Sequence, residues 1–211
     1  MHPVLDHVFI LVKPDNQVAE KLRQIGLYEG KSRIHQGQGT SNNRFLLSNG
    51  MLELLWVHDV LETQTGPAKG LRFSERSTDP EASPFGLVFR NEDDDVQSVP
   101  YKGWSYQPDY FPAPVAFHIG ENASRLSEPL CIYMPYRFEG DKEHAKALHR
   151  LTNVKVDVMS DTQSGVLETI RSFDRLDIET GSGHLLTVEL DAHQAGHSFD
   201  FRPNTPLILK W

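Results

Sequence analysis

Several features that would define the class of this protein are scarce or missing. Its 211 residues include one cysteine, Cys131, so no intrachain disulfide can form and a disulfide-stabilised secreted scaffold is excluded. Cys131 lies in the apolar run "PLCIYMPY", which predicts a buried and unreactive thiol. No apolar run approaches the roughly 20 residues of a membrane-spanning helix, and the N-terminus lacks the basic start of a signal peptide. We therefore expect a cytoplasmic protein with no membrane partner.

Positive charge is also scarce. The chain has 21 Lys and Arg against 29 Asp and Glu, a formal net charge of −8. This argues against nucleic acid as the main partner, because phosphate binding requires a basic surface. The acidic run "EDDDV" at 92–96 is typical of a solvated turn. There is no Gly-rich phosphate-binding loop and no convincing Ser-His-Asp arrangement, which leaves a small molecule as the expected partner.

The first part of the chain alternates between strand-like and helical patterns. Residues 4–12, "VLDHVFILV", are rich in β-branched and aromatic side chains and predict a buried strand. An apolar stripe at helical spacing follows over 18–25. Three strand-like runs come next, the last two joined by Asn49-Gly50, a strong hairpin signal because both residues tolerate positive φ. Residues 1–58 therefore predict a β-α-β-β-β module.

A similar order returns near the end of the sequence. Residues 151–158, "LTNVKVDV", predict a strand, and a helical stripe and further strand-like runs follow. Aligning this strand with "LDHVFILV" places Asn153 opposite His7. The weak self-similarity predicts a second β-α-β-β-β module over 151–211.

The central residues, 59–150, are predicted to be a linker with additional strands and an aromatic loop. A further strand-like restart lies at 83–95, but the helix that should follow it is missing. Prolines and aromatic residues over 97–115 forbid a long helix and predict an irregular loop lying across a neighbouring surface. The sequence leaves open whether 83–135 is a degenerate module or an insertion.

These patterns together resemble a known family. After the strand "LDHVFILV" and a short helix come His35, then "GTSN" at 39–42, "RFLL", and "LEL" at 52–54. This order resembles the glyoxalase-like branch of the vicinal oxygen chelate superfamily, which includes glyoxalase, extradiol dioxygenases and bleomycin-resistance proteins. The resemblance is specific over 5–57 and looser after about residue 83.

The resemblance implies an α+β fold. Paired β-α-β-β-β modules would form a curved mixed sheet around a cavity, with the aromatic and proline-rich segment as an irregular insertion. The three segments 1–58, 59–150 and 151–211 would together make one glyoxalase-like domain. Because cavity walls in this superfamily are often completed by a second subunit, the resemblance also implies a homodimer.

Metal ligands are a further implication of the resemblance. In metal-dependent members the ligands come from the first and fourth strands of a module, and His7 and Glu53 occupy these positions. An imidazole nitrogen and a carboxylate oxygen suit divalent Zn, Ni, Mn or Fe. Two ligands do not hold a metal well, however, and Asn153 is a poor substitute for a second histidine. A hydrogen-bonded His7–Glu53 pair without metal is equally consistent with the sequence.

The polar stretch "HQGQGTSNNRF" at 35–45 is a candidate binding element. Its glycines would let the backbone approach a ligand, and its side chains offer hydroxyl, amide, imidazole and guanidinium groups. The alternative is a hairpin connection whose asparagines only cap turns. An aromatic lid over the cavity would add a contact. The candidate substrate-binding residues are Gly39, Thr40, Asn42, Arg44 and Trp104.

Two functions are consistent with these residues. The first is a metal-dependent lyase, isomerase or dioxygenase acting on a small carbonyl or enediol-forming substrate. A metal at His7 and Glu53 would stabilise a developing oxyanion, while Glu53 or His35 moves protons. The second is a metal-free protein of the bleomycin-resistance type that binds a small molecule. A buried Glu53 favours the first function, and Asn153 favours the second.

Overall fold

The computed structural model describes residues 3–14, 17–91, 98–135, 144–159 and 162–211, so the acidic run at 92–96 lies outside the described residues. No helix in these segments is long and apolar enough to cross a membrane. The α-helices are α1 (Val18–Gln24), α2 (Val60–Gln64), α3 (Phe73–Thr78) and α4 (Gly165–Ile170). The strands are β1 (Pro3–Leu11), β2 (Tyr28–Glu29), β3 (Arg33–His35), β4 (Thr40–Leu47), β5 (Gly50–Val57), β6 (Phe85–Asn91), β7 (Gly103–Tyr106), β8 (Phe117–Gly120), β9 (Leu130–Met134), β10 (Leu151–Val158), β11 (Leu176–Thr180), β12 (Leu185–Leu190), β13 (Ser198–Asp200) and β14 (Leu207–Lys210).

Most predictions of local structure are confirmed. The predicted first strand is β1, the helical stripe is α1, and Asn49-Gly50 joins β4 to β5 in an antiparallel hairpin. The polar stretch at 35–45 is more regular than a loop, because β3 ends at His35 and β4 begins at Thr40. Only residues 36–39 turn between these two strands.

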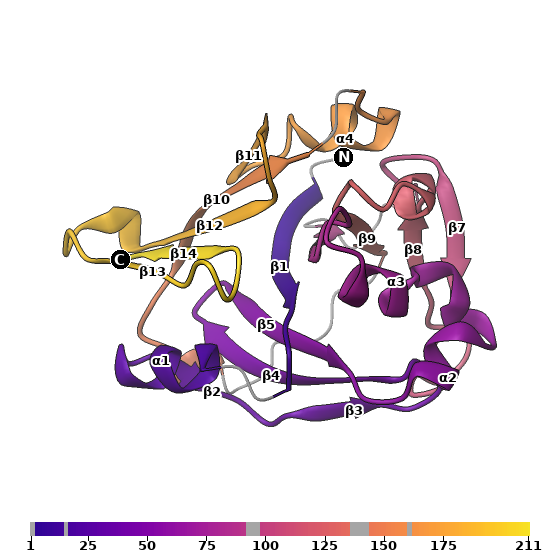
Figure 1. Cartoon of the computed structure of the whole chain (residues 1–211), viewed down its shortest axis with the longest axis horizontal. Helices are drawn as coiled ribbons and strands as arrows, with labels where there is room; N and C mark the ends of the chain where they lie inside the picture. Colours follow the sequence, from indigo (N-terminus) through magenta and orange to yellow (C-terminus); the bar gives the residue numbers. More distant parts are fainter. Residues whose placement is uncertain (1–2, 15–16, 92–97, 136–143, 160–161) are drawn as a thin grey trace.

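The larger sheet has nine strands in the order β2-β4-β5-β1-β6-β9-β8-β7, with β3 also paired to β4 (Figure 1). Its centre is the antiparallel pair β1–β6. On one side β1 pairs in parallel with β5, and on the other side β6 pairs in parallel with β9. Residues 85–134 therefore mirror the strand pairing of residues 3–57. The region around 83–135 continues the sheet, and its described residues include no α-helix after β6, so it is a sheet-forming module rather than a loop-like insertion.

The smaller sheet has five strands in the order β11-β10-β12-β14-β13. Here β10 pairs in parallel with β11, the strand directly after α4. In the larger sheet β1 pairs in parallel with β5, the last strand of its module. Residues 151–211 thus share the order strand, helix, strands with residues 1–58 but differ in connectivity. The α+β fold with mixed sheets is confirmed, whereas the predicted copy of the first module is not seen in the strand pairing.

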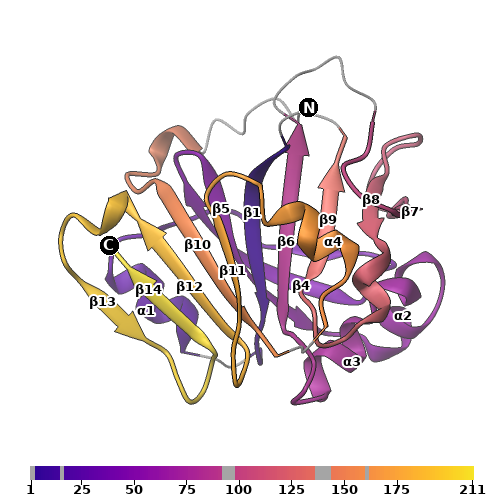
Figure 2. The same ribbon diagram turned by 90° about the horizontal axis from the view of Figure 1, so that it is seen from above.

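The two sheets lie face to face (Figure 2), and one apolar core includes residues of both. Alternation along β1 buries Val8 and Ile10 in this core, together with Val154 of β10 and the buried side of α1. At the β4–β5 turn the amide of Asn49 bonds the main chain of Leu151 in both directions, at 2.9 and 2.8 Å. The smaller sheet therefore covers one face of the larger sheet and leaves the opposite face of β1, β5 and β6 for a cavity.

Candidate functional site

A cavity of about 690 Å³ lies on that opposite face. The strand alternation that buries Val8 and Ile10 turns His7 and Phe9 toward it. The wall has a polar part and an apolar part. The polar residues include Asp6, His7, Arg33, His35, Gln38, Asn42, Arg44, Glu53 and Arg90, and the apolar residues include Phe9, Leu55, Leu71, Phe73, Val88, Phe117, Ile132 and Met134.

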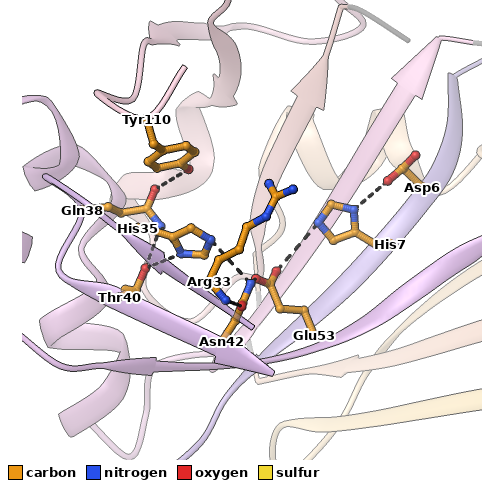
Figure 3. Close-up of polar contacts among 9 residues, drawn as sticks. All are labelled: Asp6, His7, Arg33, His35, Gln38, Thr40, Asn42, Glu53 and Tyr110. Carbon is orange, nitrogen blue, oxygen red and sulfur yellow. Dashed lines mark hydrogen bonds and ion pairs between the residues drawn. The ribbon is translucent and has the colours of Figure 1, made fainter. Parts of the chain in front are cut away.

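The carboxylate of Glu53 lies at the centre of the polar part (Figure 3). Glu53 is 7% exposed on β5. Its Oε2 is 3.9 Å from Nε2 of His7, and its Oε1 accepts a hydrogen bond from the side-chain amide of Asn42. A buried carboxylate is costly unless it is paired or hydrogen-bonded, and Glu53 has both kinds of neighbour.

Asn42 has its amide orientation fixed by a second partner. The main-chain N–H of Arg33 donates to Oδ1 of Asn42 at 2.7 Å. Because that N–H can only donate, the amide oxygen must face β3, and the NH₂ group then faces Glu53. Asn42 therefore orients the carboxylate rather than capping a turn.

His7 is held from its other side by Asp6. The Nδ1 atom of His7 is 2.7 Å from Oδ1 of Asp6, whose Oδ2 is 3.1 Å from Nε of Arg90. Burial alone would lower the pKa of His7. The hydrogen bond to Asp6 and the charges of Asp6 and Glu53 outweigh burial and raise the pKa above its ordinary value. His7 is thus an imidazole that is readily protonated, with its Nε2 toward Glu53.

His35 differs from His7, because its pKa is lowered. Its Nδ1 is 2.9 Å from Oγ1 of Thr40, and its Nε2 is 3.5 Å from the amide nitrogen of Asn42. The amide nitrogen of Gln38 also lies 3.5 Å from Nδ1, so each ring nitrogen has an amide NH₂ group nearby. Burial lowers the pKa of His35; the charge of Glu53 opposes this effect, and the charges of Arg33 and Arg44 add to it. The two histidines near Glu53 therefore favour different protonation states.

The aromatic loop closes the polar part through Gln38. The hydroxyls of Tyr106 and Tyr110 both donate to Oε1 of Gln38 at 3.1 Å, and Nε2 of Gln38 donates to Thr40 at 2.8 Å. The ring of Tyr110 lies 5.2 Å from the ring of His35. The sequence predicted an aromatic lid, but it did not identify Gln38 as its partner, since one glutamine in a polar stretch carries no distinctive signal.

The predicted site residues fall into two groups. His7, His35, Asn42, Arg44 and Glu53 come together on the wall of the cavity. Gly39, Thr40 and Trp104 do not lie on that wall among the described residues. Their roles as ligand contacts therefore have no support from their placement.

The positions of these three residues have local causes. Gly39 has φ of +71°, and a Cβ there would lie 2.3 Å from the main-chain oxygen of Asp59, so the close neighbour is the protein itself. The hydroxyl of Thr40 is hydrogen-bonded to Nδ1 of His35. Trp104 packs on the main chain of Gly70, where an added Cβ would lie 2.6 Å from the indole.

The side chains at Glu53 do not complete a transition-metal site. Across the described segments, no group of three or more His, Cys, Asp or Glu residues is arranged to hold a metal ion. Nε2 of His35 faces the NH₂ group of Asn42, which leaves His7 and Glu53 as the two donors at this point. The permanent charge of Arg44 also acts on both histidines. Two donors beside a fixed cation do not fit the expected Zn, Ni, Mn or Fe.

Other histidine and acidic side chains that could have supplied a third ligand lie elsewhere. Nε2 of His118 is 2.9 Å from the main-chain oxygen of Tyr101. Glu128 accepts from both the main chain and the hydroxyl of Ser164 at the start of α4. Glu189 lies on β12 of the smaller sheet. Asn153, the residue aligned with His7, lies on β10, and its amide donates to Asp177.

No protein-family model and no curated protein matches this chain. Solved structures do match. A hypothetical protein from Staphylococcus aureus is 14% identical with a TM-score of 0.62, and the match covers 99% of each chain. This likeness shows a shared fold over the whole length.

Two further solved structures match part of the chain. A hypothetical protein from Bacillus halodurans is 12% identical with a TM-score of 0.40, over 67% of this chain and 99% of that chain. Methylmalonyl-CoA epimerase from Mycobacterium tuberculosis is 17% identical with a TM-score of 0.38, over 67% of this chain and 91% of that chain.

Proposed function

We propose that this protein is an enzyme that moves a proton at the carbon next to a carbonyl group of a small organic substrate. The observation that carries the proposal is the arrangement at Glu53, a buried carboxylate 3.9 Å from Nε2 of His7 on the wall of a cavity. Removing a proton beside a carbonyl requires a base for the proton and a donor for the carbonyl oxygen. Glu53 and His7 offer these two groups side by side.

Glu53 is the base in this mechanism. Asn42 holds Oε1, which leaves Oε2 on the side of His7 to take the proton. The electrons of the broken C–H bond form the new C=C bond, and the carbonyl electrons move to oxygen to give an enolate. His7, protonated because Asp6 raises its pKa, donates a hydrogen bond to that oxygen. Return of the proton to carbon or oxygen completes an isomerisation without a net change in redox state.

Two further groups support the same chemistry. His35 is neutral, and its Nε2 faces the NH₂ group of Asn42, so it supports the amide that orients Glu53. Arg44 contributes a permanent positive charge close to both histidines, which favours a developing enolate. All of these groups belong to the protein, and none of the steps uses a metal held by His7 and Glu53.

A metal-free binding protein is the second candidate. Apolar side chains from several elements also line the cavity, including Phe9, Phe73 and Phe117. A wall of this kind would retain a small apolar ligand whether or not a reaction follows. Binding without proton transfer is therefore the result that would favour this function.

Solvent deuterium exchange tests the proposal. The wild type is incubated in D₂O with a panel of small ketones and 2-oxo acids, and loss of the ¹H NMR signal beside the carbonyl is followed. We expect exchange faster than the buffer rate for at least one compound, reduced roughly 100-fold or more in Glu53→Gln. Glu168→Gln, an exposed carboxylate on α4, is the matched control and should exchange like the wild type. Exchange that survives Glu53→Gln would contradict the proposal.

A further inference from the structure

The cavity wall carries an excess of positive charge in an acidic protein. The whole chain has a net charge of −8. Yet three guanidinium groups, from Arg33, Arg44 and Arg90, line the cavity against two carboxylates, from Asp6 and Glu53. A local surplus of this sign in a chain of the opposite sign indicates an anionic ligand.

The three guanidinium groups differ in their partners. Arg90 pairs with Asp6 at 3.1 Å, and Nε of Arg44 donates to the main-chain oxygen of Lys31 at 2.6 Å. Arg33 donates to Asn42 through its main-chain N–H and not through its guanidinium. In the described part of the chain its guanidinium has no hydrogen-bond or ion-pair partner. Arg33 is therefore the cation that is available to a ligand.

Arg33 is placed over the proposed reaction centre. Figure 3 shows its guanidinium between the rings of His35 and His7, on the cavity side of Glu53. Asn42 accounts for this position, because one amide bonds the main chain of Arg33 and the carboxylate of Glu53. An anion held by Arg33 would lie next to the atoms that His7 and Glu53 act on.

The apolar part of the cavity wall indicates the chemistry of the rest of the ligand. Phe9 and Phe73 meet edge to face with ring centroids 6.0 Å apart, and Val88, Phe117, Ile132 and Met134 line the same cavity. This surface provides no charge for a second polar group. It suits an aromatic ring or a branched alkyl group attached to the reacting end.

We infer that the substrate is an amphipathic 2-oxo acid. Its carboxylate pairs with Arg33, its carbonyl lies at His7 and Glu53, and its apolar side chain occupies the aromatic part of the cavity. A planar carboxylate matches the fork of one guanidinium. The position of the carbonyl rests on the proposed function, whereas the pairing with Arg33 does not.

Three probes separate the parts of this inference. 2-Oxo-4-phenylbutanoate has both the carboxylate and the ring, 4-phenylbutan-2-one lacks the carboxylate, and pyruvate lacks the ring. Calorimetry gives their dissociation constants for the wild type, Arg33→Gln, Arg33→Lys and the exposed control Arg171→Gln, and D₂O exchange is measured on the same samples. Thermal unfolding checks that each variant is folded, which is expected because Arg33 is exposed.

The wild type should bind 2-oxo-4-phenylbutanoate about tenfold more tightly than either truncated probe. Arg33→Gln should weaken binding of the two acids about tenfold and leave the ketone unchanged. Arg33→Lys should bind the acids with an affinity between those of the wild type and Arg33→Gln, since lysine keeps the charge and loses the planar guanidinium fork. Arg171→Gln should bind like the wild type.

Any other outcome would overturn either the inference or the proposed function. Equal affinity for ketone and acid, unchanged binding of the acid by Arg33→Gln, or no binding of any probe would overturn the inference. Binding of the acid that depends on Arg33 but brings no exchange would contradict the proposed function alone. Exchange of the two acids, with both affinity and rate unchanged by Arg33→Gln, would support the proposed function and overturn the inference.

Discussion

The side-chain amide of Asn42 joins the carboxylate of Glu53 to the main chain of Arg33. One planar group thus fixes the edge strand β3 and the proposed base in a single orientation. Asn42→Ala should therefore free Glu53 to rotate and reduce deuterium exchange roughly 10- to 100-fold, without removing the base. The exchange rate of folded Asn42→Ala against wild type checks this expectation.

The neighbouring residue gives a matched control. Asn43 points the other way along β4, and its amide donates to Glu29 and Ser32 at 3.0 and 3.2 Å. Asn43→Ala should keep the wild-type exchange rate. If both alanine variants lose the same activity, Asn42 has no specific role in orienting Glu53.

Stability should depend on pH through Asp6 and His7. The pKa of His7 is raised above its ordinary value of 6.5 in the folded protein. Its protonated form is therefore favoured by folding, so this contribution is fully present below about pH 6.5 and disappears as the pH rises through the folded pKa. Asp6→Asn removes the main partner. The difference in unfolding free energy between wild type and Asp6→Asn should be largest near pH 6 and shrink toward about pH 9.

Urea unfolding at several pH values measures this difference. Asp200→Asn is the control, because the exposed pair with Arg202 lowers the pKa of Asp200 to about 2, far below this range. A difference between wild type and Asp6→Asn that stays constant with pH would show that His7 does not gain a proton on folding.

Arg76 is expected to contribute strongly to stability. It is 2% exposed, and its guanidinium donates to four main-chain oxygens, including those of Ser83 at 3.2 Å and Glu128 at 2.7 Å. Arg76→Met would leave these buried acceptors unpaired and should cost about 3 kcal/mol in urea unfolding. Lys69→Met, an exposed substitution nearby, should change stability by less than about 0.5 kcal/mol. A cost below about 1 kcal/mol for Arg76→Met would show that water or other groups replace the guanidinium.

Cys131 should be unreactive in the folded protein. The sequence predicted a buried thiol, and the structure places it at 0% exposure on β9. Burial raises the pKa of this thiol to about 12, so almost none of the reactive thiolate is present at neutral pH. A thiol reagent should label the chain in urea and leave it unlabelled in buffer. Rapid labelling in buffer would show that β9 opens readily.

Local patterns in the sequence predicted much of this fold. Strand β1, helix α1 and the Asn49-Gly50 turn each follow from a few neighbouring residues. Their alternation also brought His7 and Glu53 to one face. The strand pairing was harder to predict, because β1 and β6 are far apart in sequence. No short motif specifies which of the later strand-like segments pairs with β1. For this reason we predicted from the sequence that 1–58 pairs with 151–211, whereas in the structure β1 pairs with β6, whose segment has no α-helix among its described residues.

The remaining part of the site depends on contacts that spacing does not reveal. Asp6 lies beside His7 in the chain, but the sequence does not reveal the register shift between Leu5 and His7 at which the two side chains meet. Arg33 was missed because it lies on a three-residue edge strand with little periodicity. Gly39 was assigned to a ligand because a glycine signals close approach, and the sequence cannot show that the approaching group is Asp59.

The most direct test of the central claim is the exchange rate of wild type before and after removal of metal ions. The protein is purified without an affinity tag, dialysed against a chelator and analysed for Zn, Ni, Mn and Fe. Proton transfer by Glu53 and His7 predicts the same exchange rate before and after chelation, with no increase when any of these ions is added. An exchange rate that vanishes on chelation, returns with one of the ions and fails to return in His7→Gln would contradict the claim and establish a metal site at this pair.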